Sequence, residues 1–130
     1  MANAIYPKFK EAAHGGSIAL ATDVVKAILV DSGSYTYSAA HEFLSDVSAT
    51  IATSAAVTGK TLTDGQFNCS DPVFTAVASG GPHEYVIFFV DTGVAGTSEL
   101  ICFIDTATGL PVTPNGLDIT VQIGTYVYAL

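Results

Sequence analysis

The sequence predicts an all-β, mainly antiparallel fold: a β-sandwich or flattened barrel with one or two short helices and an N-terminal arm. Short apolar segments rich in β-branched and aromatic residues recur along the chain between turn signals, as in all-β proteins. The composition, with 49% hydrophobic and 12% charged residues, favours a compact core over disorder. The 130 residues fit one domain. We expect residues 1–16 to form the arm and residues 17–130 a single β domain.

Residues 85–90 (YVIFFV) and 100–104 (LICFI) are the strongest strand signals in the chain. A small, polar, Gly-containing loop separates them, which predicts two antiparallel strands joined by a hairpin connection. Neither segment alternates between apolar and polar residues. Both faces of each strand should therefore be covered, and the pair is expected in the middle of a sheet.

Residues 6–14 predict one or two helical turns, because Pro7 suits the first helical position and Gly15-Gly16 would end the helix. The segment holds two of the four lysines in a chain whose formal net charge is −8. One interpretation is a basic, aromatic arm that contacts an acidic neighbouring subunit; the other is a terminal helix packed on its own domain. The contact residues of such an arm would be Tyr6, Lys8, Phe9 and Lys10.

Several further elements follow from local signals. Ser38 is a good N-cap for a short helix over residues 38–47, which has one apolar face. Asp64-Gly65 is a strong signal for a two-residue hairpin turn. The remaining strands or extended segments are expected at residues 23–30, 48–57, 61–63, 66–68, 73–77, 118–123 and 126–130.

Asp31, Asp91 and Asp105 each follow an apolar strand, and Ser-Gly or Thr-Gly follows the first two. Aspartic proteases present their catalytic carboxylates in this way, so Asp31 and Asp91 could form a pair within one chain, or either could pair across a dimer. Asp in this position also accepts hydrogen bonds from the backbone two residues on, and Gly supplies a positive φ. The third occurrence favours turn chemistry, and the hydrolase remains an alternative.

Charge and motifs exclude other classes of function. The chain has 4 Lys or Arg against 12 Asp or Glu, which argues against binding to nucleic acid or an anionic membrane. No apolar run approaches the roughly 20 residues of a membrane span, and the N-terminus does not resemble a signal peptide. Cys69 and Cys102 are expected to be buried free thiols, although the spacing does not exclude a disulfide. The three histidines lack a ligand spacing, and no G-x-S-x-G, P-loop or G-x-G-x-x-G motif occurs, so we expect no metal, no cofactor and no enzymatic activity.

The connection at residues 109–116 (GLPVTPNG) is apolar for a loop. It is expected either to contact a protein partner or to pack across the open end of the sandwich. Its contact residues would be Leu110, Pro111, Val112, Pro114 and Asn115.

Four segments of the sequence carry a resemblance to a known family. They are residues 2–10 (ANAIYPKFK), 25–31 (VKAILVD), 35–44 (YTYSAAHEFL) and 109–116 (GLPVTPNG). Together they resemble a group of small virion proteins of tailed bacteriophages, and the resemblance extends over nearly the whole chain. It consists of structural segments and includes no chemical motif.

The resemblance implies a virion component assembled in the host cytoplasm. The expected role is that of a head decoration (cement) protein, a homo-oligomer, with a trimer favoured, that binds the major capsid protein on the outer surface of the shell. A tail, neck or fibre-associated virion protein is the alternative. The resemblance brings no catalytic residues.

Overall fold

A computed structural model describes residues 4–16, 18–20, 22–31, 33–47, 50–63, 66–79, 83, 85–104, 113–122 and 128–129. The all-β prediction is confirmed, because these residues form mainly antiparallel sheets with one short helix and one 3-10 turn. The sheets do not close into a barrel within the described residues.

The main sheet has five strands in the order β1-β8-β7-β2-β3, and every neighbouring pair is antiparallel. The predicted central hairpin is confirmed as β7 and β8, with β7 at the centre of the sheet. The strands are β1 (Ala4–Ile5), β2 (Val25–Val30), β3 (Thr50–Thr53), β7 (Tyr85–Val90) and β8 (Leu100–Ile104).

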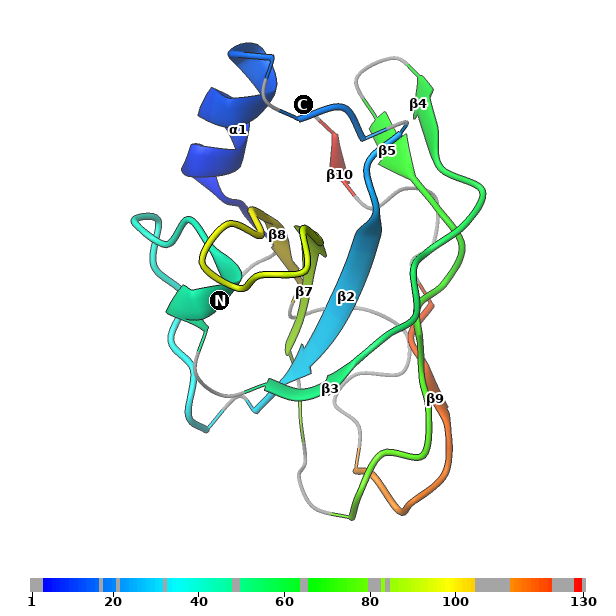
Figure 1. The fold of residues 1–130 in the computed structure, drawn as a ribbon. Helices are drawn as coiled ribbons and strands as arrows, with labels where there is room; N and C mark the ends of the chain where they lie inside the picture. Colours follow the sequence, from blue (N-terminus) through cyan, green and yellow to red (C-terminus); the bar gives the residue numbers. More distant parts are fainter. Residues whose placement is uncertain are drawn as a thin grey trace.

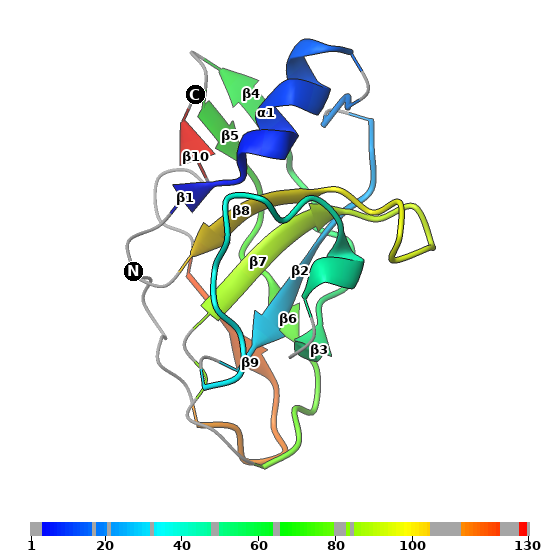
Figure 2. The same ribbon diagram turned by 90° about the vertical axis from the view of Figure 1, so that its left-hand side faces the viewer.

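Two smaller sheets lie on one face of the main sheet, and residues 33–47 lie on the opposite face (Figures 1 and 2). The burial of both faces explains why β7 and β8 read as unbroken apolar runs. One small sheet joins β10 (Tyr128–Ala129), β5 (Gln66–Asn68) and β4 (Thr61–Thr63), and the other joins β6 (Val73–Phe74) to β9 (Ile119–Thr120).

Aromatic side chains gather around Phe103 in β8. The ring centroids of Tyr85, Tyr37 and Tyr35 lie 4.7, 5.3 and 6.2 Å from that of Phe103. Tilted and edge contacts at these distances are favourable for aromatic rings, because the positive edge of one ring meets the negative face of the next. This cluster attaches residues 33–47 to the sheet.

Residues 4–16, the described part of the predicted arm, pack against the domain and do not extend from it. Strand β1 pairs with β8, the Tyr6 amide donates to the Ile101 carbonyl at 3.1 Å, and helix α1 (Pro7–His14) packs against β8. Pro7 begins the helix and Gly15 caps it, as predicted. Of the two interpretations of this segment, the packed terminal helix is the one observed.

The predicted helix at residues 38–47 is wrong in extent, since only a 3-10 turn, η1 (Leu44–Asp46), forms. The Asp46 carboxylate accepts hydrogen bonds from the amides of Glu42 and Phe43, at 2.9 and 3.0 Å. Phe43 is extended, with φ −118° and ψ 161°, and forms a β-bridge with Glu99. A side-chain cap and a tertiary strand contact thus replace the local helical preference.

Candidate functional site

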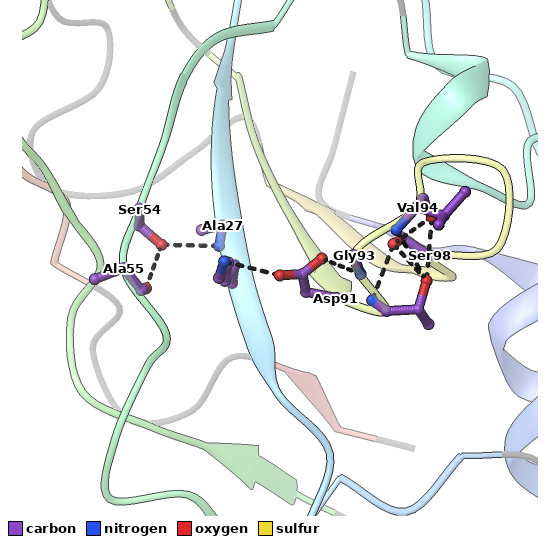
Figure 3. Close-up of polar contacts among 9 residues, drawn as sticks. Ala27, Ser54, Ala55, Asp91, Gly93, Val94 and Ser98 are labelled. Carbon is purple, nitrogen blue, oxygen red and sulfur yellow. Dashed lines mark hydrogen bonds and ion pairs between the residues drawn. The ribbon is translucent and has the colours of Figure 1, made fainter.

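The Asp91-Thr92-Gly93 segment forms the turn that leaves β7. The Gly93 amide donates to Asp91 Oδ1 at 2.9 Å, and Gly93 has φ +88°, a conformation that favours glycine (Figure 3). The Thr92 amide donates to the hydroxyl of the fully buried Ser98 at 3.1 Å, and that hydroxyl donates to the Val94 carbonyl at 2.9 Å. These bonds satisfy backbone groups of the turn, which is the turn chemistry that the sequence predicts.

The other oxygen of Asp91 makes an ion pair with β2. Lys26 Nζ lies 2.8 Å from Asp91 Oδ2, and both side chains are partly buried. The Lys26 ammonium, followed by the Gly93 amide, lowers the pKa of Asp91 below its usual value. Both carboxylate oxygens therefore have structural partners.

Asp31 plays a similar role where β2 ends. Its Oδ1 accepts from the Gly33 amide and its Oδ2 from the Ser34 hydroxyl, both at 3.0 Å, and these bonds lower its pKa. His83 is 6% exposed, and its Nδ1 lies 3.7 Å from Asp31 Oδ1. That distance is within the range of an ion pair and too long for a hydrogen bond.

Asp31 and Asp91 lie at opposite ends of the β2–β7 pair. Val30 is opposite Tyr85 and Val25 is opposite Val90. The C-terminal end of β2, where Asp31 follows, and the C-terminal end of β7, where Asp91 follows, are therefore at opposite ends of the pair. Six residues at about 3.4 Å each put the carboxylates roughly 20 Å apart. They cannot share a proton within one chain, so the single-chain protease pair is wrong. Asp105 lies outside the described residues.

Three polar side chains, two of them buried and one partly exposed, link the N-terminal segment to residues 33–47. The hydroxyls of Tyr6 and Tyr35 are 2.8 Å apart, and the Tyr35 hydroxyl lies 2.7 Å from His41 Nδ1. Burial raises the pKa of both tyrosines. These two contacts connect the residue before α1 to the 33–47 segment, and no local sequence pattern identifies Tyr35 as their centre.

The predicted partner-contact residues divide into three groups. Tyr6 and Phe9 are fully buried, so their assignment to a contact surface is corrected: they pack in the domain's own core. Pro114 is also buried, whereas Lys10 and Asn115 are exposed and Lys8 is partly exposed. Leu110, Pro111 and Val112 lie outside the described residues.

The cysteines are two buried free thiols, as predicted. Burial raises the pKa of Cys69 to about 11 and also raises that of Cys102, so neither favours the thiolate. Within the described residues, no three His, Cys, Asp or Glu side chains gather to hold a metal ion. No helix in the same part of the chain is long and apolar enough to cross a membrane.

Glu99 is a feature that the sequence analysis missed. It immediately precedes β8, its Oε1 is buried, and no described residue donates a hydrogen bond to that oxygen. Burial, and then the charges of Glu42 and Glu11, raises the pKa of Glu99 to about 7. The sequence does contain one signal for a partly buried carboxylate: Glu99 lies directly before an apolar strand, and no cationic residue is adjacent to it.

Comparison with protein-family models and with curated protein sequences finds no match to this chain.

Proposed function

We propose that this protein is a head decoration protein of a tailed bacteriophage. It binds the outer surface of the assembled capsid as a trimer and joins neighbouring copies of the major capsid protein. The proposal rests on the resemblance of four segments to small virion proteins. The structure adds one observation in support: the candidate catalytic side chains are bonded within the domain, whereas several apolar side chains are exposed.

The polar groups that invited a chemical interpretation are engaged inside the domain. Asp91 is bonded to Gly93 and Lys26, and Asp31 to Gly33 and Ser34. Several large apolar side chains, by contrast, remain between 39% and 66% exposed. These residues are Val24, Ile51, Leu62, Val73, Val94 and Leu117. On a domain with few charges, these side chains supply apolar area for contact with a protein partner.

The mechanism would be burial of apolar area at several capsomer junctions. A protein that binds the assembled shell but not free subunits stabilises the shell by mass action. This amounts to about 2.7 kcal/mol per site when its free concentration is 100 times the dissociation constant. The proposed contacts are the exposed side of α1, with Lys8 and Lys10, and the segment around Asn115. Leu117 belongs to this second contact, since its amide donates to Asn115 Oδ1 at 3.3 Å.

The test is add-back of purified protein to expanded, undecorated heads, with isolated tails as the comparison. We expect saturable co-sedimentation with heads, local three-fold density in images of the particle, and greater resistance of the heads to heat. Binding to tails without binding to heads would overturn the decoration role and favour a tail or neck protein.

A matched pair of variants tests the contact surface. Leu117 and Val94 are 66% and 61% exposed. The segment that leads into β9 (orange) and the loop between β7 and β8 (yellow) lie in well-separated parts of the molecule (Figures 1 and 2). Leu117→Asp should weaken head binding at least tenfold, and Val94→Asp should leave it unchanged. Equal loss in both variants would contradict the proposed contact.

A further inference from the structure

Two segments that are distant in the sequence close the outer edge of β8. At one end, Ala4 and Ile5 pair with Phe103 and Cys102, and the Tyr6 amide bonds to Ile101. At the other end, the Leu100 amide donates to the Glu42 carbonyl at 2.9 Å, and the Leu44 amide donates to the Ser98 carbonyl at 2.8 Å. We call residues 4–6 and 42–45 the two edge segments.

Glu99 stands at the junction between these segments. Its bridge with Phe43 is a non-hydrogen-bonded antiparallel pair, because the bonds run between the flanking residues 42 and 100 and between 44 and 98. In such a pair the two side chains lie close together on one side of the sheet. The Glu99 side chain is thereby held against the second edge segment, with Oε1 buried and without a hydrogen-bond donor among the described residues.

The charged groups around Glu99 do not compensate its ionised form. Glu42 acts on it from the second edge segment, and Glu11 acts on it from α1; both repel a carboxylate. Lys8 is the attractive group, and its Nζ already lies 3.3 Å from Glu11. On the β7 side, Val90 contacts Glu99 through the backbone, and Asp91 is paired with Lys26. An ionised Glu99 would be a poorly solvated charge between two carboxylates.

We propose that Glu99 is a pH-sensitive latch: the neutral carboxyl lets residues 42–45 and α1 close over the edge of β8, and the carboxylate loosens them. A carboxyl group whose pKa is raised in the folded state stabilises that state most below the unfolded value, about 4.3, and the contribution is lost as the pH rises through about 7. The loosened state exposes the β8 edge and the side of α1 that holds Phe9. This inference does not depend on the proposed virion role.

The first experiment measures amide hydrogen exchange by mass spectrometry at pH 6 and pH 8.5, corrected for the intrinsic rate. In the native chain, peptides covering residues 7–14 and 42–47 should exchange at least tenfold faster at pH 8.5, while peptides from β2 stay unchanged. Glu99→Gln should abolish this difference. Asp118→Asn is the matched control, because it removes the same charge from another part of the chain and should retain the difference.

Glu42→Gln should reduce the difference, because it removes one of the two repelling carboxylates. Equal pH dependence in the native chain and in Glu99→Gln would overturn the latch. Because Glu99→Gln could destabilise the fold, the second measurement uses the native chain. Its Glu99 carboxyl carbon, followed by NMR, should titrate near pH 7, and a midpoint near 4.3 would overturn the proposal.

Discussion

Three carboxyl groups in this chain meet three different environments. Asp91 lies beside an ammonium group and a backbone amide, Asp46 accepts two backbone amides, and Glu99 is partly buried beside other carboxylates. The first two therefore have lowered pKa values and Glu99 a raised one. Local sequence predicts the hydrogen bond from the residue two positions after Asp91, because that bond is sequence-local. It cannot predict Lys26 as the partner, because that contact requires β2 to pair with β7.

The Asp91–Lys26 pair should affect stability in a pH-dependent way. Asp91→Asn keeps an oxygen for the Gly93 amide but loses the ion pair, and we expect it to lower the free energy of unfolding by about 1 kcal/mol at pH 7. The native pKa is lowered, so the stabilisation is present above pH 4 and is lost as the pH falls through the folded value. Urea unfolding of both proteins from pH 7 to pH 2 checks this.

The difference in free energy of unfolding between the native protein and Asp91→Asn should disappear as the pH approaches 2. Asp91→Ala serves as the comparison, because it also removes the acceptor for the Gly93 amide and should cost more at every pH. A constant gap for Asp91→Asn from pH 7 to pH 2 would show that the ion pair is not its source.

At the level of elements, the β7–β8 hairpin was predictable and the 33–47 segment was not. Both hairpin strands have continuous apolar runs that identify them without tertiary information. The 38–47 stretch has a helical apolar pattern, but Phe43 forms a β-bridge with Glu99 and is not part of a helix. Likewise, Tyr6 and Phe9 read as exposed aromatic contacts because no local pattern reveals the core that covers them. Tertiary pairing overrides local propensity in such segments.

Two glycines in the hairpin loop provide a matched test of its geometry. Gly93 has φ +88° and Gly96 does not have a positive φ, and an added Cβ would meet nothing within 4 Å at either position. Gly93→Ala should therefore lower the free energy of unfolding by roughly 1 kcal/mol through backbone strain alone. Gly96→Ala should be neutral or slightly stabilising. Thermal unfolding distinguishes them, and equal melting temperatures would contradict the assigned turn.

At the scale of the whole molecule, the main sheet is covered on both faces, which isolates its centre from solvent. Cys102 in β8 is 2% exposed, whereas Cys69, after β5, lies near the surface at 9%. Exposure of the Cys102 thiol therefore requires the whole fold to open, whereas exposure of the Cys69 thiol requires only a peripheral segment to open. Regions near the edge of a structure open locally at lower free energy than the core does.

Thiol labelling in increasing urea should separate these two kinds of opening. We expect Cys102 to react only through global unfolding, with the same dependence on urea as the loss of β-sheet circular dichroism. Cys69 should react at lower urea with a weaker dependence. A Cys69→Ser variant isolates the Cys102 signal, and labelling of Cys102 without added urea would contradict its position in the core.

The closure of the β8 edge also has a consequence for synthesis on the ribosome. Ala4 pairs with Phe103, so almost a hundred further residues must be synthesised after Ala4 before its partner strand leaves the ribosome. At roughly 5–20 residues per second this delay is about 5–20 s. During it, Tyr6 and Phe9 are without the core that later buries them. Lys8 and Lys10 lie beside them, and charged residues that flank an exposed apolar segment reduce its tendency to aggregate.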